Sequence, residues 1–257
     1  MIFHYLKIAF RNLCKHKTQN IISIIGLAVG LLCFCVCIYC SRFVESTDHC
    51  FANHDRIAEL NLYDGKADRY FSGSPVPLAE ELRTWALGET EAISSVTYPR
   101  ERPYYVELSP EKTLPYELET IEIDTCYNKI FTPEMVAGHW KMASQSLNSV
   151  ILSQSMAIKI FGNAESAIGK HMTLMRRLNT SPESTPKTGG IVYTIQAVMK
   201  DIPLNNSLDF MQNIDMLTVN DSEGLLQSSK RHNMTGANTY VLLSPQTTRS
   251  EERRVGK

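Results

Sequence analysis

Few residues in this sequence stand at spacings that could support catalysis or bind a nucleotide. The nearest approach to a phosphate-binding loop is Gly162 together with Gly169-Lys170. That loop needs the spacing G-x-x-x-x-G-K followed by Ser or Thr for Mg²⁺, whereas six residues separate these glycines and His171 follows the lysine. We therefore interpret Gly162 as the end of a helix and Gly169-Lys170 as a turn. The sequence predicts no ATP site.

The sequence gives equally little support for a metal site or for a Ser-His-Asp catalytic triad. The seven histidines include no H-x-x-x-H pair, the spacing that places two imidazoles on one helix face. His49 and His54 lie beside Asp48 and Asp55, which are ligand types found in zinc sites, but a solvated loop is the better interpretation. No G-x-S-x-G sequence is present to position a nucleophilic serine. We predict a non-catalytic chain with no cofactor and no metal.

A long apolar stretch organises the rest of the chain. Residues 21–40 are twenty consecutive residues without a charge. As a helix this stretch is about 30 Å long, the thickness of the hydrocarbon core of a bilayer. It is too long for the apolar core of a signal peptide and has no small-x-small cleavage site or lipoprotein cysteine, and a buried soluble helix would show a polar face. We predict an uncleaved transmembrane helix.

The flanking charges predict the orientation of this helix. Four basic residues and no acidic one stand in the preceding segment, at positions Lys7, Arg11, Lys15 and Lys17, whereas Arg42, Glu45 and Asp48 follow. The positive-inside rule then places residues 1–20 in the cytoplasm and everything after Cys40 across the membrane. The cysteines divide accordingly, and only Cys50 and Cys126 fall in the outer part, where they either pair or remain free thiols.

Two features of the membrane part could contact partners. Lys7, Arg11 and Lys15 form a basic stripe at helical spacing, opposite an apolar face, so residues 1–20 should form an amphipathic helix in the interface with membrane lipid. A solvated charged face predicts much the same pattern. Within the apolar stretch, Gly26 and Gly30 form G-x-x-x-G, a spacing that lets helix backbones approach closely.

The part after Cys40 has the composition of an ordinary folded domain. The chain has 257 residues with net charge −1, and no basic excess suggests nucleic acid. Strand-like runs mix with short helical runs, without strict alternation, which predicts an α+β domain. Expected strands include 56–63, 93–98, 104–108, 118–123, 149–152, 171–175, 191–199 and 239–243. One expected helix begins near Pro75 and Pro77, a second runs from Thr132-Pro133 to Gly138, and a third follows Ser153. Residues 178–190 should be a loop.

A series of short motifs, each loose, runs over residues 3–245 in a fixed order. They are Tyr5–Leu13, Ile24–Gly30, His54-Asp55-Arg56-Ile57, Ile123-Asp124 with Phe131 and Gly138, Val150–Ser153 with Ile160-Phe161-Gly162 and Ile168–Lys170, Val198–Pro203 with Asn206-Ser207, and Thr239–Leu243. In this order they resemble the MacB/FtsX-type permease subunits of ABC transporters, in the form common in Bacteroidetes. Ala197 departs from the family's usual Gly, and Leu208 from a common His.

The resemblance implies an architecture and partners. Such permeases have one transmembrane helix, a MacB-like periplasmic core domain and three more transmembrane helices. They pair with a separate ABC-type ATPase, usually as permease dimers, in the cytoplasmic membrane. ATP hydrolysis inside is transmitted mechanically to the periplasmic domain, which drives efflux or acts on a periplasmic partner. We expect this chain to be the non-catalytic permease subunit.

The expected organisation has four parts. They are a cytoplasmic basic helix at 1–20, the transmembrane helix at 21–40, the periplasmic core domain at 41–248, and a tail at 249–257 that resembles a translated sequencing adapter. We therefore expect a truncated permease whose last three transmembrane helices are missing. The alternative is a single-helix membrane-anchored binding or sensor module, complete as written. A membrane-anchored enzyme ranks last because no catalytic motif supports it.

Overall fold

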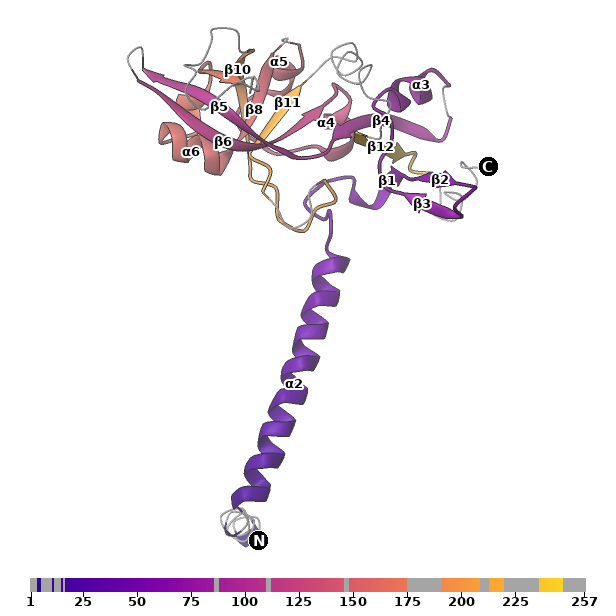
Figure 1. Ribbon diagram of the computed structural model, residues 1–257, viewed down its shortest axis with the longest axis vertical. Coiled ribbons are helices and arrows are strands. Elements are labelled where there is room, and N and C mark those ends of the chain that lie inside the picture. The colour runs from indigo at the N-terminus through magenta and orange to yellow at the C-terminus, as the bar shows by residue number, and fades with distance from the viewer. Residues whose placement is uncertain are drawn as a thin grey trace. The chain divides into compact units, whose positions relative to one another are not determined.

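The computed structural model describes most of the chain as two separate units (Figure 1). The described residues are 4, 5, 11, 15, 17–85, 88–109, 112–145, 148–174, 191–208, 213–219 and 236–246. The first unit is Met1–Thr47 and the second, which we call the outer unit, is Asp48–Lys257. Lys7, the expected loop at 178–190 and the expected tail at 249–257 lie outside the described residues.

The first unit contains the helix α2, Lys17–Glu45, which has no buried residue. Among the described residues it is the one helix long and apolar enough to cross a membrane, and an 18-residue stretch of it has a mean hydropathy of 2.9. It extends beyond the predicted 21–40 at both ends, because the polar flanks contain no Pro and helix formation propagates readily into them. Its 29 residues correspond to about 44 Å of helix.

The outer unit is built on a ten-stranded sheet, with a separate two-stranded hairpin, in the part of the chain that the structure describes. The strands of the sheet are β1 (Ile57–Leu60), β4 (Thr90–Thr97), β5 (Arg100–Ser109), β6 (Lys112–Ile123), β7 (Met135–Gly138), β8 (Ser149–Ser153), β9 (His171–Leu174), β10 (Val192–Met199), β11 (Met216–Val219) and β12 (Ala237–Leu243). The hairpin pairs β2 (Leu62–Asp64) with β3 (Arg69–Phe71).

Six of these strands pair in a closed ring, in the order β5-β6-β11-β8-β10-β9 and back to β5. One core cluster takes buried side chains from every strand of this ring, so it fills the interior. Residues of alternate parity, such as Ile121 and Ile123 of β6, face the other way into a second cluster. From β6 the sheet continues outward through β4 and β12 to β1.

Short helices cover the faces that the strands leave open. α6 (Gln154–Phe161) and the 3-10 helix η2 (Glu165–Ala167) contribute to the ring-interior cluster. α4 (Tyr127–Phe131) and α5 (Trp140–Gln145) pack into the second cluster, and α3 (Leu78–Thr84) packs on β4 and β12. The 3-10 helix η1 (His54–Arg56) precedes β1. This mixed arrangement confirms the predicted α+β class.

Two predicted elements are wrong in detail. The helix expected from Thr132-Pro133 to Gly138 is the strand β7, which pairs antiparallel with the end of β10. The helix in this region comes earlier, and α4 ends at Thr132, whose φ is 38°. The single strand expected at 56–63 is two strands, because β1 pairs with β12 whereas β2 turns back onto β3.

Local signals gave the correct helix after β8. The Ser153 hydroxyl accepts a hydrogen bond from the Met156 N–H, as an N-cap should, and α6 ends at Gly162 with φ 86°. The expected strands at 171–175 and 191–199 are β9 and β10, which pair antiparallel.

Candidate functional site

The outer unit begins with a segment, residues 48–56, that we call the joint segment. It starts three positions after the last residue of α2. Asp48 opens it with φ 63°. The Asp48 N–H donates to the Asn205 carbonyl (3.1 Å), and its carboxylate accepts from the Ser207 N–H (2.8 Å). The Tyr240 hydroxyl of β12 in turn donates to the Ser207 carbonyl (3.0 Å). Asp48 is thereby connected through a turn to the central sheet.

The middle of the joint segment contacts α4. The buried Phe51 ring lies edge-on to Phe131, with 5.0 Å between the ring centroids. The Asn53 amide donates to the Lys129 carbonyl (3.1 Å) at the end of α4, and the Thr132 hydroxyl accepts from the Ala52 N–H (3.4 Å). This side of the joint segment therefore caps the carboxyl end of a short helix whose last carbonyls have no partner within the helix.

Arg56 connects the end of the joint segment to two strands. Its guanidinium donates to Asn53 Oδ1 (3.0 Å), to the Leu243 carbonyl of β12 (2.9 Å) and to Glu91 of β4 (2.9 Å). The Arg56 side chain is 30% exposed, so these charge-assisted bonds are only partly screened by water. The motif residues Asp55-Arg56 thus mark a structural attachment.

The two histidines of the joint segment lie side by side. The His49 and His54 rings are tilted with centroids 4.4 Å apart, and His54 Nε2 lies 3.3 Å from Asp55. His54 Nδ1 is 3.1 Å from the Phe51 carbonyl. Within the described residues, no group of three His, Cys, Asp or Glu could hold a metal ion.

Cys50 and Cys126, whose pairing the sequence left open, are both free thiols in the structure. Partial burial, followed by the charge of Asp48, raises the pKa of the Cys50 thiol to about 11. Burial also raises the pKa of Cys126, although Arg83 opposes the shift. Both thiols are therefore mostly protonated at neutral pH, which makes them poor nucleophiles.

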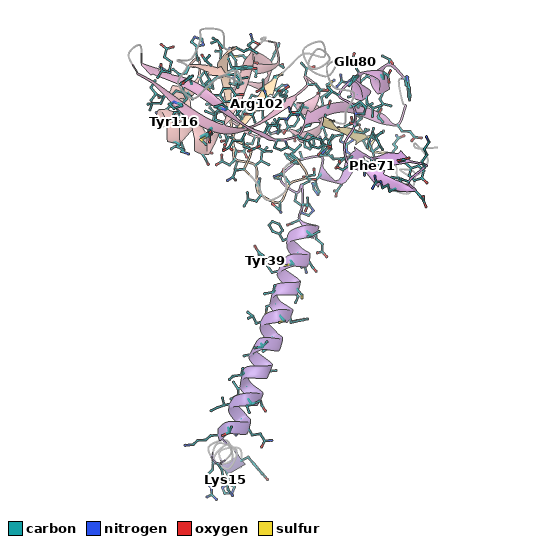
Figure 2. All side chains as sticks on the ribbon, in the orientation of Figure 1. Lys15, Tyr39, Phe71, Glu80, Arg102 and Tyr116 are labelled. Carbon is teal, nitrogen blue, oxygen red and sulfur yellow. The ribbon has the colours of Figure 1, made fainter. Side chains whose placement is uncertain are left out.

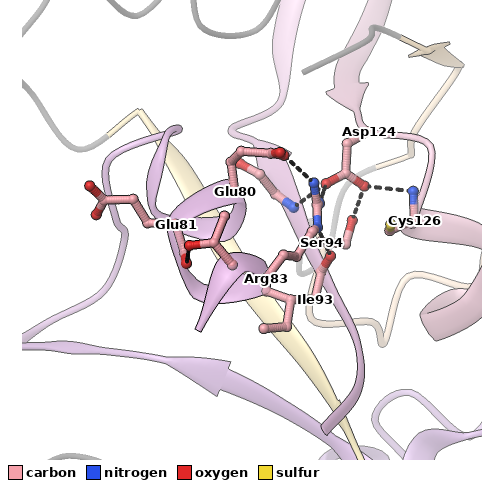
Figure 3. A network of polar contacts seen from close by, with 9 residues as sticks. Glu80, Glu81, Arg83, Ile93, Ser94, Asp124 and Cys126 are labelled. Carbon is pink, nitrogen blue, oxygen red and sulfur yellow. Dashed lines mark hydrogen bonds and ion pairs between the residues drawn. The ribbon is translucent and has the colours of Figure 1, made fainter. Parts of the chain in front are cut away.

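The densest polar network of the outer unit surrounds Asp124 (Figure 3). Its side chain is 3% exposed and forms an ion pair with Arg83 of α3. The same carboxylate accepts from the Ser94 hydroxyl (2.7 Å), the Ser95 N–H (3.1 Å) and the Cys126 N–H (3.0 Å). These bonds compensate the cost of burying the charge.

Arg83 completes the network on the α3 side. It also donates to the Ile93 carbonyl (2.9 Å) and to Glu80 (2.8 Å). Figure 3 shows Glu81 pointing away from this group. Because every charge of the Arg83–Asp124 pair has a partner within the chain, the network fixes α3 and α4 to β4 and is not a vacant binding site.

A second polar group lies at the interior of the ring. Arg102 of β5 and Glu122 of β6 form an ion pair at 2.6 Å, and the Tyr104 ring stands edge-on to Tyr193. Burial raises the pKa of Tyr193 to about 12. Sequence reasoning missed this group, because the Tyr104–Tyr193 contact depends on ring closure and the Arg102–Glu122 pair on the register of β5 and β6. The alternation of Arg102 and Tyr104 on a single strand was its one local signal.

The remaining motif residues have structural roles. Asp201 accepts from the Ser155 N–H (3.0 Å) and so caps the amino end of α6. Gly138 faces Ala197 across the β7–β10 pair and has φ 73°, and a Cβ there would stand 2.3 Å from the Gln196 carbonyl oxygen. Only glycine fits at Gly138. Because Gly138 has no side chain, the Ala197 side chain can lie opposite it, at the position where the family that the motifs resemble usually has glycine.

Gly26 and Gly30 lie in the exposed middle of α2, and a Cβ at either position would meet no other atom within 4 Å. Arg11 and Lys15 are helical and exposed. In Figure 2, Lys15 and Tyr39 project from the first unit, whereas Arg102 and Tyr116 belong to the outer unit. In the part of the chain that the structure describes, Gly26, Gly30, Arg11 and Lys15 are therefore all exposed.

Comparison with known proteins defines the fold of the outer unit. No family model matches the sequence, and no curated protein matches it. Among solved structures, a domain assigned to a permease protein of Porphyromonas gingivalis is 22% identical with a TM-score of 0.59, covering 80% of this chain and 82% of that one. The periplasmic region of MacB from Actinobacillus actinomycetemcomitans is 11% identical with a TM-score of 0.52, covering 82% and 85%.

A third neighbour is the extracellular domain of the ABC-type transporter YknZ from Gram-positive bacteria, which is 13% identical with a TM-score of 0.45 and covers 78% of this chain and 89% of that one. At this score the likeness is too weak to establish a shared fold. The first two neighbours are sufficient for the conclusion. The outer unit has the fold of a MacB-like periplasmic domain, as the motif resemblance predicts.

Proposed function

We propose that this protein is the permease subunit of an ABC transporter of the MacB/FtsX type. One observation supports this above all: a helix of membrane-crossing length and composition is followed, three residues after its end, by a domain with the MacB periplasmic fold. In this function the helix anchors the chain in the cytoplasmic membrane. The outer unit works in the periplasm, on a substrate or protein partner.

The orientation of the proposed permease follows from its charges. Residues 1–20, which carry the basic stripe Lys7, Arg11 and Lys15, lie at the cytoplasmic face, where anionic lipid attracts basic side chains. A separate ABC-type ATPase binds on this side and supplies the energy, because the chain has no phosphate-binding loop of its own. Its hydrolysis cycle moves the membrane helices, and this movement reaches the outer unit through the joint segment.

Gly26 and Gly30 provide a packing surface for a second membrane helix. Apolar side chains gain nothing from exchanging lipid for another helix, so association depends on close backbone approach at small residues. We assign this surface to a permease dimer or to a neighbouring helix of the same permease.

Affinity purification from the protein's own membranes tests the proposal. After crosslinking, we expect an ATPase with a phosphate-binding loop to copurify with the tagged protein. A matched preparation with Lys7, Arg11 and Lys15 all changed to Glu should retain less of it. Absence of any ATPase from crosslinked membranes would contradict the permease function.

The extent of the gene separates the permease from its alternative. Sequencing the locus beyond the codon for Thr248 should reveal three more apolar stretches of about 20 residues. A stop codon after Lys257 in clean genomic DNA would instead favour the membrane-anchored binding module.

A further inference from the structure

Two of the left-handed residues of the outer unit lie in the joint segment or contact it. Among the described residues, four that are not glycine have left-handed φ values: Asp48 (63°), Asp68 (49°), Thr132 (38°) and Asn148 (58°). Asp68 lies in the β2–β3 turn, and Asn148 directly precedes β8. Asp48 and Thr132 instead each form a side-chain bond between the joint segment and the core, Asp48 to Ser207 and Thr132 to Ala52.

The left-handed conformation at Thr132 is the more informative of the two. Aspartate adopts this region with some ease, but a β-branched residue does so rarely. Such a conformation persists only where the surrounding structure enforces it. At Thr132 it brings the hydroxyl toward the Ala52 N–H, directly after the end of α4.

The attachments of the joint segment diverge to different parts of the core. Asp48 holds the turn at Asn205–Ser207, Phe51 and Asn53 hold α4, and Arg56 holds β4 and β12. The joint segment is therefore attached to a turn, a helix and two strands.

Behind these attachments lies a continuous row of aromatic rings. The ring centroid of Phe131 lies 4.9 Å from that of Tyr240 of β12 and 4.8 Å from that of Tyr127. Tyr127 in turn stacks on Trp140 of α5, with 6.0 Å between the ring centroids. The rings of Tyr127, Phe131 and Tyr240 are at most 1% exposed. Because interiors are packed as densely as organic crystals, they transmit strain and do not absorb it.

We propose that the joint segment is a force-transmitting clasp, in which Asp48 and Thr132 pass movement of the membrane helix to α4 and to the turn at Asn205–Ser207. This inference rests on the proposed permease function and names the residues through which that function acts. Asp48 and Thr132 are positioning residues: they connect the moving part to the core.

Hydrogen exchange of the full-length protein in nanodiscs, with its ATPase bound, tests the clasp in two steps. Without ATP, Asp48→Ala should increase exchange of the Ser207 and Ala52 amides about tenfold, because local opening frees both. With ATP, exchange at Tyr127–Phe131 should change in the unaltered protein and remain unchanged in Asp48→Ala. Asp68→Ala is the matched control, since Asp68 is also left-handed and accepts a hydrogen bond, from Tyr63 (2.7 Å); it should behave like the unaltered protein.

Two further variants guard against a simple folding defect. Thr132→Gly removes the hydroxyl and relieves the left-handed strain, so it should fold at least as well and still lose the ATP-dependent change. Asp48→Asn keeps an acceptor oxygen and should preserve the response. An ATP-dependent change at α4 that is equal in Asp48→Ala, Thr132→Gly and the unaltered protein would overturn the clasp.

The two proposals fail in different ways. If no ATPase binds the unaltered protein, the permease function fails, and the clasp, which rests on it, fails as well. If the ATPase binds every variant and the exchange differences do not appear, the clasp fails and the permease function stands.

Discussion

The side chains of the membrane-length helix α2 and those of the Asp124 network have opposite surroundings. No residue of α2 is buried, and its large apolar residues other than the half-buried Phe43 are 46–69% exposed. Asp124, by contrast, is almost fully buried and its carboxylate accepts from four groups of the same chain. The side chains of α2 face the surroundings of the chain, whereas the Asp124 carboxylate is bonded by groups of the chain itself.

This contrast indicates where the protein's partners bind. An apolar helix without buried contacts is stable only where lipid or other helices cover it. The outer unit has its own hydrophobic core, so we expect its stability to depend less on such partners. Substitutions in the outer unit should therefore change the free energy of unfolding, whereas substitutions in α2 should change association.

The largest effect should follow from Asp124→Ala. It leaves the Arg83 guanidinium, itself 23% exposed, without its buried partner, and we expect the free energy of unfolding to fall by about 3 kcal/mol. Urea denaturation in detergent, followed by tryptophan fluorescence, measures this. Asp124→Asn, which keeps the acceptor oxygen for Ser94, should lose less. A loss below that of an ordinary surface substitution would show that the network is dispensable.

Gly138→Ala should come next. The new methyl group would stand 2.3 Å from the Gln196 carbonyl oxygen at a φ of 73°, so β7 must separate from β10 or the backbone must shift. We expect a loss of about 2 kcal/mol in the same denaturation experiment. Gly65→Ala is the control, because its nearest neighbour would be Tyr63 at 3.8 Å. Equal stability of the two variants would contradict the close approach.

Replacing Gly26 and Gly30 by Leu should leave the unfolding of the outer unit unchanged. In the proposed permease these substitutions keep helices apart, and we expect association in the membrane to weaken by about 1 kcal/mol. Förster transfer between labelled copies in vesicles measures the change. Ala28→Leu, on the opposite side of the same helix, is the matched substitution. Unchanged transfer in the glycine variant would remove these residues from the helix-packing surface.

The smallest effect concerns the reactivity of Cys50. Because its pKa is about 11, the rate of alkylation should rise about tenfold for each pH unit between pH 7 and 10 as the thiolate forms. Asp48→Asn removes the second cause of the shift but not the burial, so the rate at pH 8 should rise only a few-fold. Site-resolved mass spectrometry separates Cys50 from the other cysteines. A rate that levels off near pH 9 would contradict the raised pKa.

The predictable parts of the fold were those with local signals. The cap at Ser153 and the stop at Gly162 depend on neighbours within the same helix, so their residue types suffice. Thr132-Pro133 was misleading, because these residue types are common at both ends of helices. Here they follow the end of α4, and the pairing of β7 with β10 makes the next residues a strand. Closure of the ring through β5 and β9 was equally invisible, since it depends on pairing between distant strands.

The candidate site divides in the same way. The Asp55-Arg56 and Asp201–Ser207 motifs were recognisable from the sequence, but their roles were not. Asp48 carries no motif, and its partner Ser207 stands 159 positions away. Only the folded chain brings the two together and identifies the joint segment.

Photo-crosslinking from the cytoplasmic segment tests the central claim most directly. A photoreactive amino acid placed at Arg11 or Lys15, in the protein's own membranes, should capture an ATPase, whereas the same group at Ser166 of the outer unit should not. This result would assign the chain to an ABC transporter and give its orientation together. Capture of lipid alone at Arg11 and Lys15, with no ATPase at either position, would contradict the account.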